Sequence, residues 1–155
     1  MLNRPKTSRW LAIALLTLTQ MVCADVLGPE QDELALARAR WAVTNADDYS
    51  FEFRRSCFCP TDFVRPVRIE VLDGTVTSAV YVDTEEAIPT PPTSVPTIDD
   101  LFAEIQDAID GMAFSVIAEY DAEAGYPISV SIDHIEHAID DEMGLTVASF
   151  QLGEP

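Results

Sequence analysis

Two cysteines separated by a single residue, Cys57 and Cys59, are the first candidates for chemistry in this sequence. In an oxidising compartment, two such thiols pair with each other or with a partner outside the chain. On a regular strand their Cα atoms would lie about 6.5–7 Å apart, which is the outer limit for a disulfide. A bend at Pro60 or a bulge would bring them closer, so we expect the pair to interrupt the strand before it.

This cysteine pair has three possible roles. The simplest is a disulfide that shapes a loop between two strands. A thiol redox pair is the alternative, because the positive charges of Arg54 and Arg55 would favour a thiolate. A soft-metal site is the third, since thiolates are metal ligands. The spacing departs from the Cys-x-x-Cys arrangement at a helix N-terminus, and this favours the structural disulfide.

Acidic residues and two histidines gather between residues 133 and 142. Carboxylates with imidazoles would suit Zn²⁺ or another transition metal, and the acids alone would suit Ca²⁺. The histidines would share a face on a helix but lie on opposite faces of a strand, so their geometry stays open. The spacing matches neither an EF-hand loop nor His-Glu-x-x-His, and a solvated loop is the simpler interpretation. The candidate metal ligands are Asp133, His134, His137, Asp140, Asp141 and Glu142.

Motifs of common enzyme classes are missing from the sequence. It contains no Gly-x-Ser-x-Gly, no Walker loop, no Gly-x-Gly-x-x-Gly and no zincin motif. Paired carboxylates could act as acid and base, but 27 acidic residues make any one pair unspecific. We therefore predict no catalytic residue and favour a non-enzymatic role.

The first 24 residues have the pattern of a secretory signal peptide. Arg4, Lys6 and Arg9 precede an apolar run, and Ala24 supplies the small residue before a cleavage site. That run is too short for a comfortable membrane span, and the mature chain offers no second candidate. Lipid attachment at Cys23 is the less favoured alternative, because a valine precedes it where such sites want a small residue. We expect a periplasmic or extracellular chain that begins at residue 25.

The charge of the chain limits its partners. The sequence has 9 lysines and arginines against 27 aspartates and glutamates, a formal net charge of −18. Removing the three cations of the leader takes this charge to −21. Nucleic acids and anionic lipids need a cationic surface, so the sequence predicts neither as a partner. A protein or a small molecule remains, and the sequence makes no prediction of oligomeric state.

Hydrophobic periodicity predicts two helices and six strands. Apolar residues recur at helical spacing over residues 30–46 and 98–110, and Thr97 begins the second helix with a capping box. Asp73-Gly74 is typical of a hairpin turn, and four prolines keep residues 85–96 out of a sheet. Alternating apolar and polar residues predict strands over 49–54, 67–72, 75–82, 114–120, 128–132 and 145–152.

Short, locally connected strands favour an antiparallel sheet with both helices on one face. We therefore predict an α+β fold of about six strands in the order α-β-β-β-α-β-β-β. Its length fits a single compact domain over residues 25–155. The aromatic residues Trp41, Tyr49, Phe51 and Phe53 have the periodicity of a core rather than of a ligand pocket.

Several motifs occur together over nearly all of the mature chain. The most specific are Cys57-Phe58-Cys59-Pro60 and Gly125-Tyr126-Pro127. The others are Trp41 with Asp48-Tyr49-Ser50-Phe51, Arg55-Ser56, Pro66-Val67 with Asp73-Gly74, Thr97-Ile98-Asp99-Asp100-Leu101-Phe102, Tyr120-Asp121, and Asp140-Asp141-Glu142 leading to Phe150. On these motifs the chain resembles domain-of-unknown-function family 6174, a family of exported bacterial proteins. The resemblance implies an exported, compact domain, and it implies no particular activity.

These observations favour a non-enzymatic binding or interaction module of the bacterial cell envelope. A thiol redox protein using Cys57 and Cys59 is one alternative, and a Ca²⁺- or Zn²⁺-binding module using the cluster at 133–142 is another. No other cofactor is expected.

Overall fold

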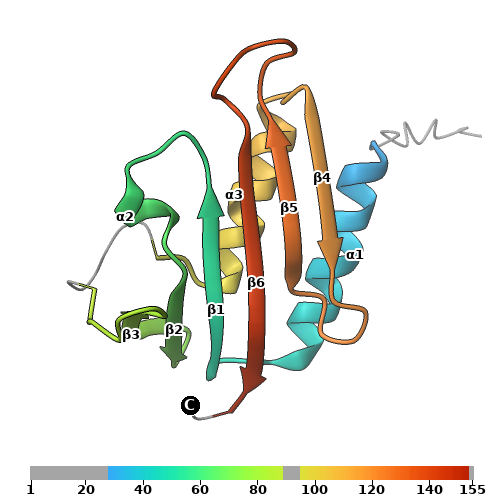
Figure 1. Cartoon of the computed structure of the whole chain (residues 1–155). Helices are drawn as coiled ribbons and strands as arrows, with labels where there is room; N and C mark the ends of the chain where they lie inside the picture. Colours follow the sequence, from blue (N-terminus) through green and yellow to red (C-terminus); the bar gives the residue numbers. More distant parts are fainter. Residues whose placement is uncertain (1–27, 89–94, 154–155) are drawn as a thin grey trace, which may run out of the picture.

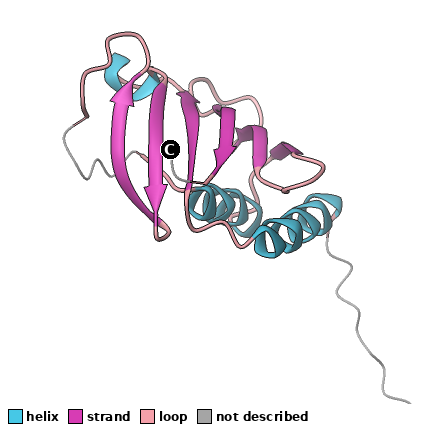
Figure 2. Ribbon diagram, turned by 90° about the horizontal axis from the view of Figure 1, so that it is seen from below, coloured by secondary structure: helices cyan, strands magenta, loops and turns pink. Residues whose placement is uncertain are grey.

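The computed structural model describes residues 28–88 and 95–153. Within them, six strands form one antiparallel sheet, and two long helices pack against one of its faces (Figures 1 and 2). The predicted leader, Cys23 and residues 89–94 of the proline-rich segment lie outside the described residues. The chain has the α+β fold and the order of main elements that the sequence predicts.

Helix α1 (Pro29–Thr44) begins with a proline in its first turn and buries one face. Leu34, Ala37 and Trp41 recur three or four residues apart, and all three are buried. A short helix that the sequence does not predict, α2 (Thr61–Val64), follows the cysteine pair and buries none of its residues. It is too short to show any hydrophobic period, which explains why the sequence gives no signal for it.

Helix α3 (Ile98–Asp110) begins with the predicted capping box. The Thr97 hydroxyl accepts a hydrogen bond from the Asp100 amide at 3.1 Å, and the Asp100 carboxylate accepts one from the Thr97 amide at 2.9 Å. The helix ends at Gly111, and the residue after it, Met112, has a left-handed conformation with φ of 54°. The buried residues of this helix are Ile98, Leu101, Phe102, Ile105 and Ala108.

The strands lie close to their predicted positions. They are β1 (Tyr49–Ser56), β2 (Val67–Leu72), β3 (Thr75–Tyr81), β4 (Ser115–Tyr120), β5 (Pro127–Asp133) and β6 (Met143–Leu152). Their order across the sheet is β3-β2-β1-β6-β5-β4, so the last strand lies beside the first at the centre. Strands β3 and β4 form the two edges of the sheet.

An irregularity between β1 and β6 brings one more aromatic side chain into the core. Ser50 lies opposite Gln151, but Glu52 lies opposite Ala148, so β6 carries an extra residue there. Within this bulge Ser149 has φ of 52°, and the next residue, Phe150, packs against the core. The Phe150 ring stacks on Tyr126 with 4.2 Å between ring centroids. The core therefore includes a residue that simple alternation along β6 would place outside.

Candidate functional site

The Cys57 and Cys59 side chains form a disulfide directly after β1. Their sulfur atoms lie 2.00 Å apart and their Cα atoms 5.2 Å apart. The chain bends at residues 57 and 58, and this bend brings the Cα atoms closer than they would be on a regular strand. Phe58, between the two cysteines, leaves 82% of its surface exposed. The small disulfide ring therefore presents an aromatic side chain to solvent.

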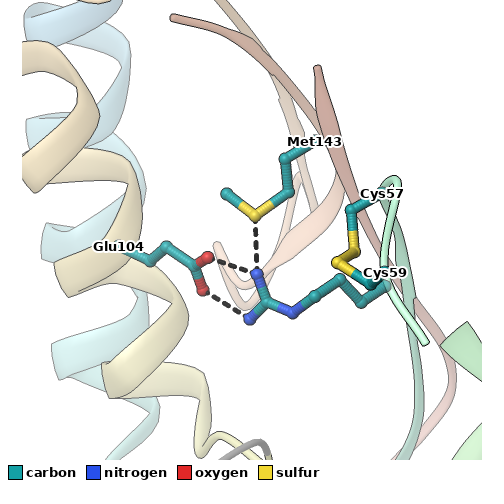
Figure 3. Close-up of polar contacts among 5 residues, drawn as sticks. Cys57, Cys59, Glu104 and Met143 are labelled. Atoms are coloured by element: carbon teal, nitrogen blue, oxygen red, sulfur yellow. Dashed lines mark hydrogen bonds and ion pairs between the residues drawn. A yellow bond between two sulfur atoms is a disulfide. The ribbon is translucent and has the colours of Figure 1, made fainter. Parts of the chain in front are cut away.

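Arg55, which the sequence suggests as an activator of these thiols, is engaged elsewhere. Its guanidinium donates to both carboxylate oxygens of Glu104 on α3, at 2.5 and 2.9 Å. It also contacts the sulfur of Met143 at the start of β6, on the helix-covered face of the sheet (Figure 3). The charge of Arg55 is therefore balanced by Glu104, whereas Arg54, the other cation beside the cysteine pair, is exposed.

The acidic cluster begins at Asp133, the last residue of β5, and the rest of it forms the loop 134–142 between β5 and β6. The two histidines of this loop therefore lie neither on a helix nor on a strand. The Asp141 carboxylate accepts a hydrogen bond from the Ile135 amide at 2.7 Å and thereby closes the loop. His137 and Asp140 both have positive φ, at 65° and 75°. His134 and His137 are exposed to solvent.

The described residues contain no group of three or more His, Cys, Asp or Glu side chains arranged to hold a metal ion. Two carboxylate oxygens of the acidic cluster are nevertheless buried without a hydrogen-bond partner, Oδ1 of Asp133 at the end of β5 and Oδ1 of Asp141 in the loop. The remaining candidates, Asp140 and Glu142, are exposed. A metal-binding role for this cluster stays a prediction.

The fold brings the two candidate regions together, although 73 residues or more separate them in the sequence. A shallow cleft of about 390 Å³ lies between the disulfide loop and the β5–β6 loop. Cys57 and Phe58 line one side of it, and Asp140 and Glu142 line the other. Because Ser56 pairs with Gly144 across β1 and β6, the loops that leave these strands must be neighbours.

We call the end of the sheet that carries loops 57–66, 111–114 and 134–142 the loop end. These loops leave strands β1, β4, β5 and β6 at the same end of the sheet, at the top of Figure 1. The Phe114 amide donates to the His134 carbonyl at 3.4 Å and joins two of the loops. Six large apolar side chains of the loop end are more than half exposed, namely Phe58, Phe63, Met112, Phe114, Ile135 and Ile139.

Sequence reasoning missed this apolar surface. The six residues are divided among three loops that are far apart in the sequence, two in each loop, so no local pattern connects them. Ile135 and Ile139 are compatible with a helical turn in the sequence, but in the structure both point to solvent. One signal in the sequence points to this surface. Large apolar residues stand in segments that proline, glycine or clustered acids mark as loops, where they have no strand or helix to pack from.

The Gly125-Tyr126-Pro127 motif has a structural role at the other end of the sheet. Gly125 has φ of 84°, and a side chain there would meet the backbone of α1, including the Trp41 nitrogen at 3.1 Å. Tyr126 stacks on Phe150, and Pro127 is fully buried at the start of β5. The aromatic residues Trp41, Tyr49, Phe51 and Phe53 are likewise buried in the core.

None of the helices in the described residues has the length and apolar character needed to cross a membrane. A family model described as a family of unknown function (DUF6174) matches residues 33–152. The match begins within α1 and ends with the last residue of β6, so it includes every strand of the sheet and the whole loop end. No curated protein sequence matches the chain.

Proposed function

The chain belongs to the DUF6174 family of unknown function, and on that premise we propose that it is an exported, non-enzymatic module of the bacterial cell envelope that binds a partner protein through its loop end. Export is supported by the basic and apolar pattern of residues 1–24. The binding role is supported by the chemistry of the loop-end surface.

The exposed apolar side chains of the loop end are the observation that carries this proposal. Soluble proteins seldom gather many large apolar side chains on one surface unless that surface binds something. Phe58, Met112 and Ile139 are each more than 80% exposed, and the loop end holds six of the eleven large apolar side chains that are exposed among the described residues. Covering such side chains by a partner would stabilise the complex by roughly 25 cal/mol for each Å² of apolar surface removed from water.

The charges at the loop end indicate what the partner surface looks like. Asp62, Glu136, Asp140 and Glu142 lie among the apolar side chains and are exposed. The one cation in these loops, Arg65, is paired with Asp83 at 2.6 Å and stacks on the ring of Tyr81. The loop end is thus apolar with an acidic border, and it fits an apolar protein surface that is bordered by lysine or arginine.

Site-specific photocrosslinking in the bacterium that produces the chain tests this proposal. A photoreactive phenylalanine analogue at position 58 or 139 should give one discrete adduct with an envelope protein. The same analogue at position 43 is the matched control, because Val43 on α1 is 84% exposed but lies outside the loop end. Equal adduct patterns at positions 58 and 43, or no adduct at either loop-end position, would overturn the proposal.

A thiol redox function is the second candidate, and one observation favours it. Cys59 is exposed and Cys57 borders the cleft, so a reductant or a substrate thiol can reach the bond. Equilibration with glutathione buffers distinguishes the two functions. A potential below about −300 mV would identify a structural disulfide, and a higher potential would identify a bond that can exchange.

A metal-binding function is the third candidate, and it depends on the unpaired oxygens of Asp133 and Asp141. Calorimetric titration with Ca²⁺ and with Zn²⁺ tests it directly. Binding tighter than millimolar that is lost in Asp141→Asn would support a site in the β5–β6 loop. Weaker binding of both ions would remove this candidate.

A further inference from the structure

The two edges of the sheet differ in how far other described segments of the chain cover them. Along β3, the segment that follows the strand turns back and adds to the edge. Val80 and Ala87 form a bridge, the Ile88 amide donates to the Ala79 carbonyl at 2.8 Å, and the Tyr81 amide donates to a carbonyl of this segment at 3.0 Å. The outer edge of β3 is therefore partly covered by an extended segment, at its Ala79–Tyr81 end.

The opposite edge, β4, has no such cover within the described part of the chain. Strand β4 pairs with β5, and no backbone hydrogen bond from another described residue reaches its outer side. The strand contains no lysine and no proline, and Glu119 is its one charged residue. Ile117, on the face away from the helices, is 65% exposed. Proteins usually protect a free edge with charges, bulges, prolines or covering segments. This edge has a charge at Glu119 and an irregular register between Glu119 and Tyr120, but no proline and no covering segment among the described residues.

Two hollows run along β4 on the side of the helices. They measure about 270 and 280 Å³ and lie between the strand, the start of α1 and the side of α3. Ile105, Ile109 and Val116 give them apolar walls, whereas Glu30 borders both hollows and Glu33 borders one. A free strand edge beside apolar hollows is the geometry by which proteins accept an added strand from a ligand.

Two glutamates without an ion-pair partner among the described residues border these hollows. Glu30 and Glu33 are exposed and form no ion pair with any residue that the structure describes. The charge of Glu33 also acts at the end of β4, where burial and then this carboxylate raise the pKa of Tyr120 to about 12 against the opposing charge of Arg38. An occupant of this edge must therefore bring positive charge.

We infer that the outer edge of β4 binds an extended segment of a partner protein, with apolar side chains facing the helices and lysine or arginine beside them. The segment would add a seventh strand to the sheet and place alternate side chains in the two hollows. Its basic side chains would meet Glu30 and Glu33. A second copy of this chain is a poorer occupant, because each mature copy carries a formal net charge of −21. This site is separate from the loop end, and neither proposal depends on the other.

A peptide titration of the ¹⁵N-labelled exported chain tests the inference. The probe is a seven-residue peptide in which valine alternates with threonine and a lysine stands at each end. We expect chemical-shift changes confined to residues 115–120 and 30–33, with slower amide exchange along β4. The same peptide with glutamate at its ends, or with a central proline, should not bind.

Charge variants make the test specific for the hollows. The double variant Glu30→Gln/Glu33→Gln should weaken binding of the lysine peptide about tenfold, as expected for the loss of two exposed ion pairs. The matched control is Asp32→Asn/Asp107→Asn, which removes the same charge from exposed positions on α1 and α3 outside the hollows. This control should bind the lysine peptide with an affinity within about twofold of that of the unaltered chain.

Four results would overturn the inference. The first is the absence of shifts in β4 up to millimolar peptide, and the second is an equal loss of affinity in both double variants. The third is a set of β4 shifts that depend on protein concentration without peptide, which would identify a second copy as the occupant. Shifts at loop 57–66 instead of β4 would also refute the edge site, while leaving the loop-end proposal in place.

Discussion

Replacing Tyr49 by phenylalanine should destabilise the fold through a single hydrogen bond. The Tyr49 side chain is 1% exposed, and its hydroxyl accepts a hydrogen bond from the Ile98 amide at 3.1 Å. Ile98 is the first residue of α3, so its amide has no partner within the helix. Tyr49→Phe leaves this buried amide unpaired, which should lower the free energy of unfolding by about 1–3 kcal/mol at neutral pH.

The effect of this substitution should shrink at alkaline pH. Burial raises the pKa of the Tyr49 hydroxyl to about 12, against the opposing effect of the Ile98 amide, whereas in the unfolded chain it ionises near pH 10. Between these values the unfolded chain has released a proton that the folded chain retains. The wild-type free energy of unfolding therefore falls as the pH rises, by about 1.4 kcal/mol per pH unit. The variant lacks this loss, so the difference in free energy of unfolding between the two proteins should change by up to about 3 kcal/mol between pH 10 and 12, which is enough to remove it.

Urea denaturation followed by the fluorescence of Trp41 provides the measurement. The Trp41 ring lies edge-on to Tyr49, with 5.3 Å between centroids, so its emission should report unfolding of this part of the core. The other tyrosines with raised pKa, Tyr120 and Tyr126, are present in both proteins and cancel in the comparison. A difference that stays constant from pH 8 to pH 12, or no difference at pH 8, would refute the reasoning.

Further substitutions test other parts of the fold by denaturation at neutral pH. Gly125→Ala should lower the free energy of unfolding by about 2–4 kcal/mol, because φ of 84° and the backbone of α1 both oppose a side chain. Gly74→Ala should lower it by only about 1 kcal/mol, because an added side chain there would meet nothing within 4 Å. Arg55→Met should cost about 1–3 kcal/mol because it strands a half-buried carboxylate, whereas Arg68→Met, whose ion pairs are long and more exposed, should cost less than about 0.5 kcal/mol. Thr97→Ala removes the cap of α3 and should cost about 1 kcal/mol. Equal losses within either matched pair, or an unchanged stability in Thr97→Ala, would contradict these assignments.

The elements of the fold are predictable from the sequence because each has a strong local signal. Leu34, Ala37 and Trp41 mark a helix by their spacing, and Thr97 marks the start of the next one. The α+β class follows from the number and length of these elements. The strand order does not follow, because β6 pairs beside β1 through contacts that are distant in the sequence.

The candidate site is less predictable, since it is made by convergence of separate loops. The sequence identifies Cys57 and Cys59 as a pair and the acidic run as a loop, but it cannot show that they border one cleft. The ion pair between Arg55 and Glu104 is also out of reach of the sequence, because it depends on α3 covering the face of β1 to which alternation assigns Arg55. Phe150 shows the same limit, since one extra residue in β6 reverses the face on which it lies.

Competition for the crosslinked adduct at position 58 is the most direct test of the central claim, that the loop end binds a protein partner. Unlabelled chain added in excess should suppress the adduct, and so should a Leu36→Ser/Val43→Ser chain, which alters exposed apolar residues of α1. A Met112→Ser/Ile139→Ser chain should fail to compete while keeping the same circular dichroism and unfolding midpoint. If this loop-end variant competes as well as the unaltered chain, the apolar side chains of the loop end do not make the contact and the account is wrong.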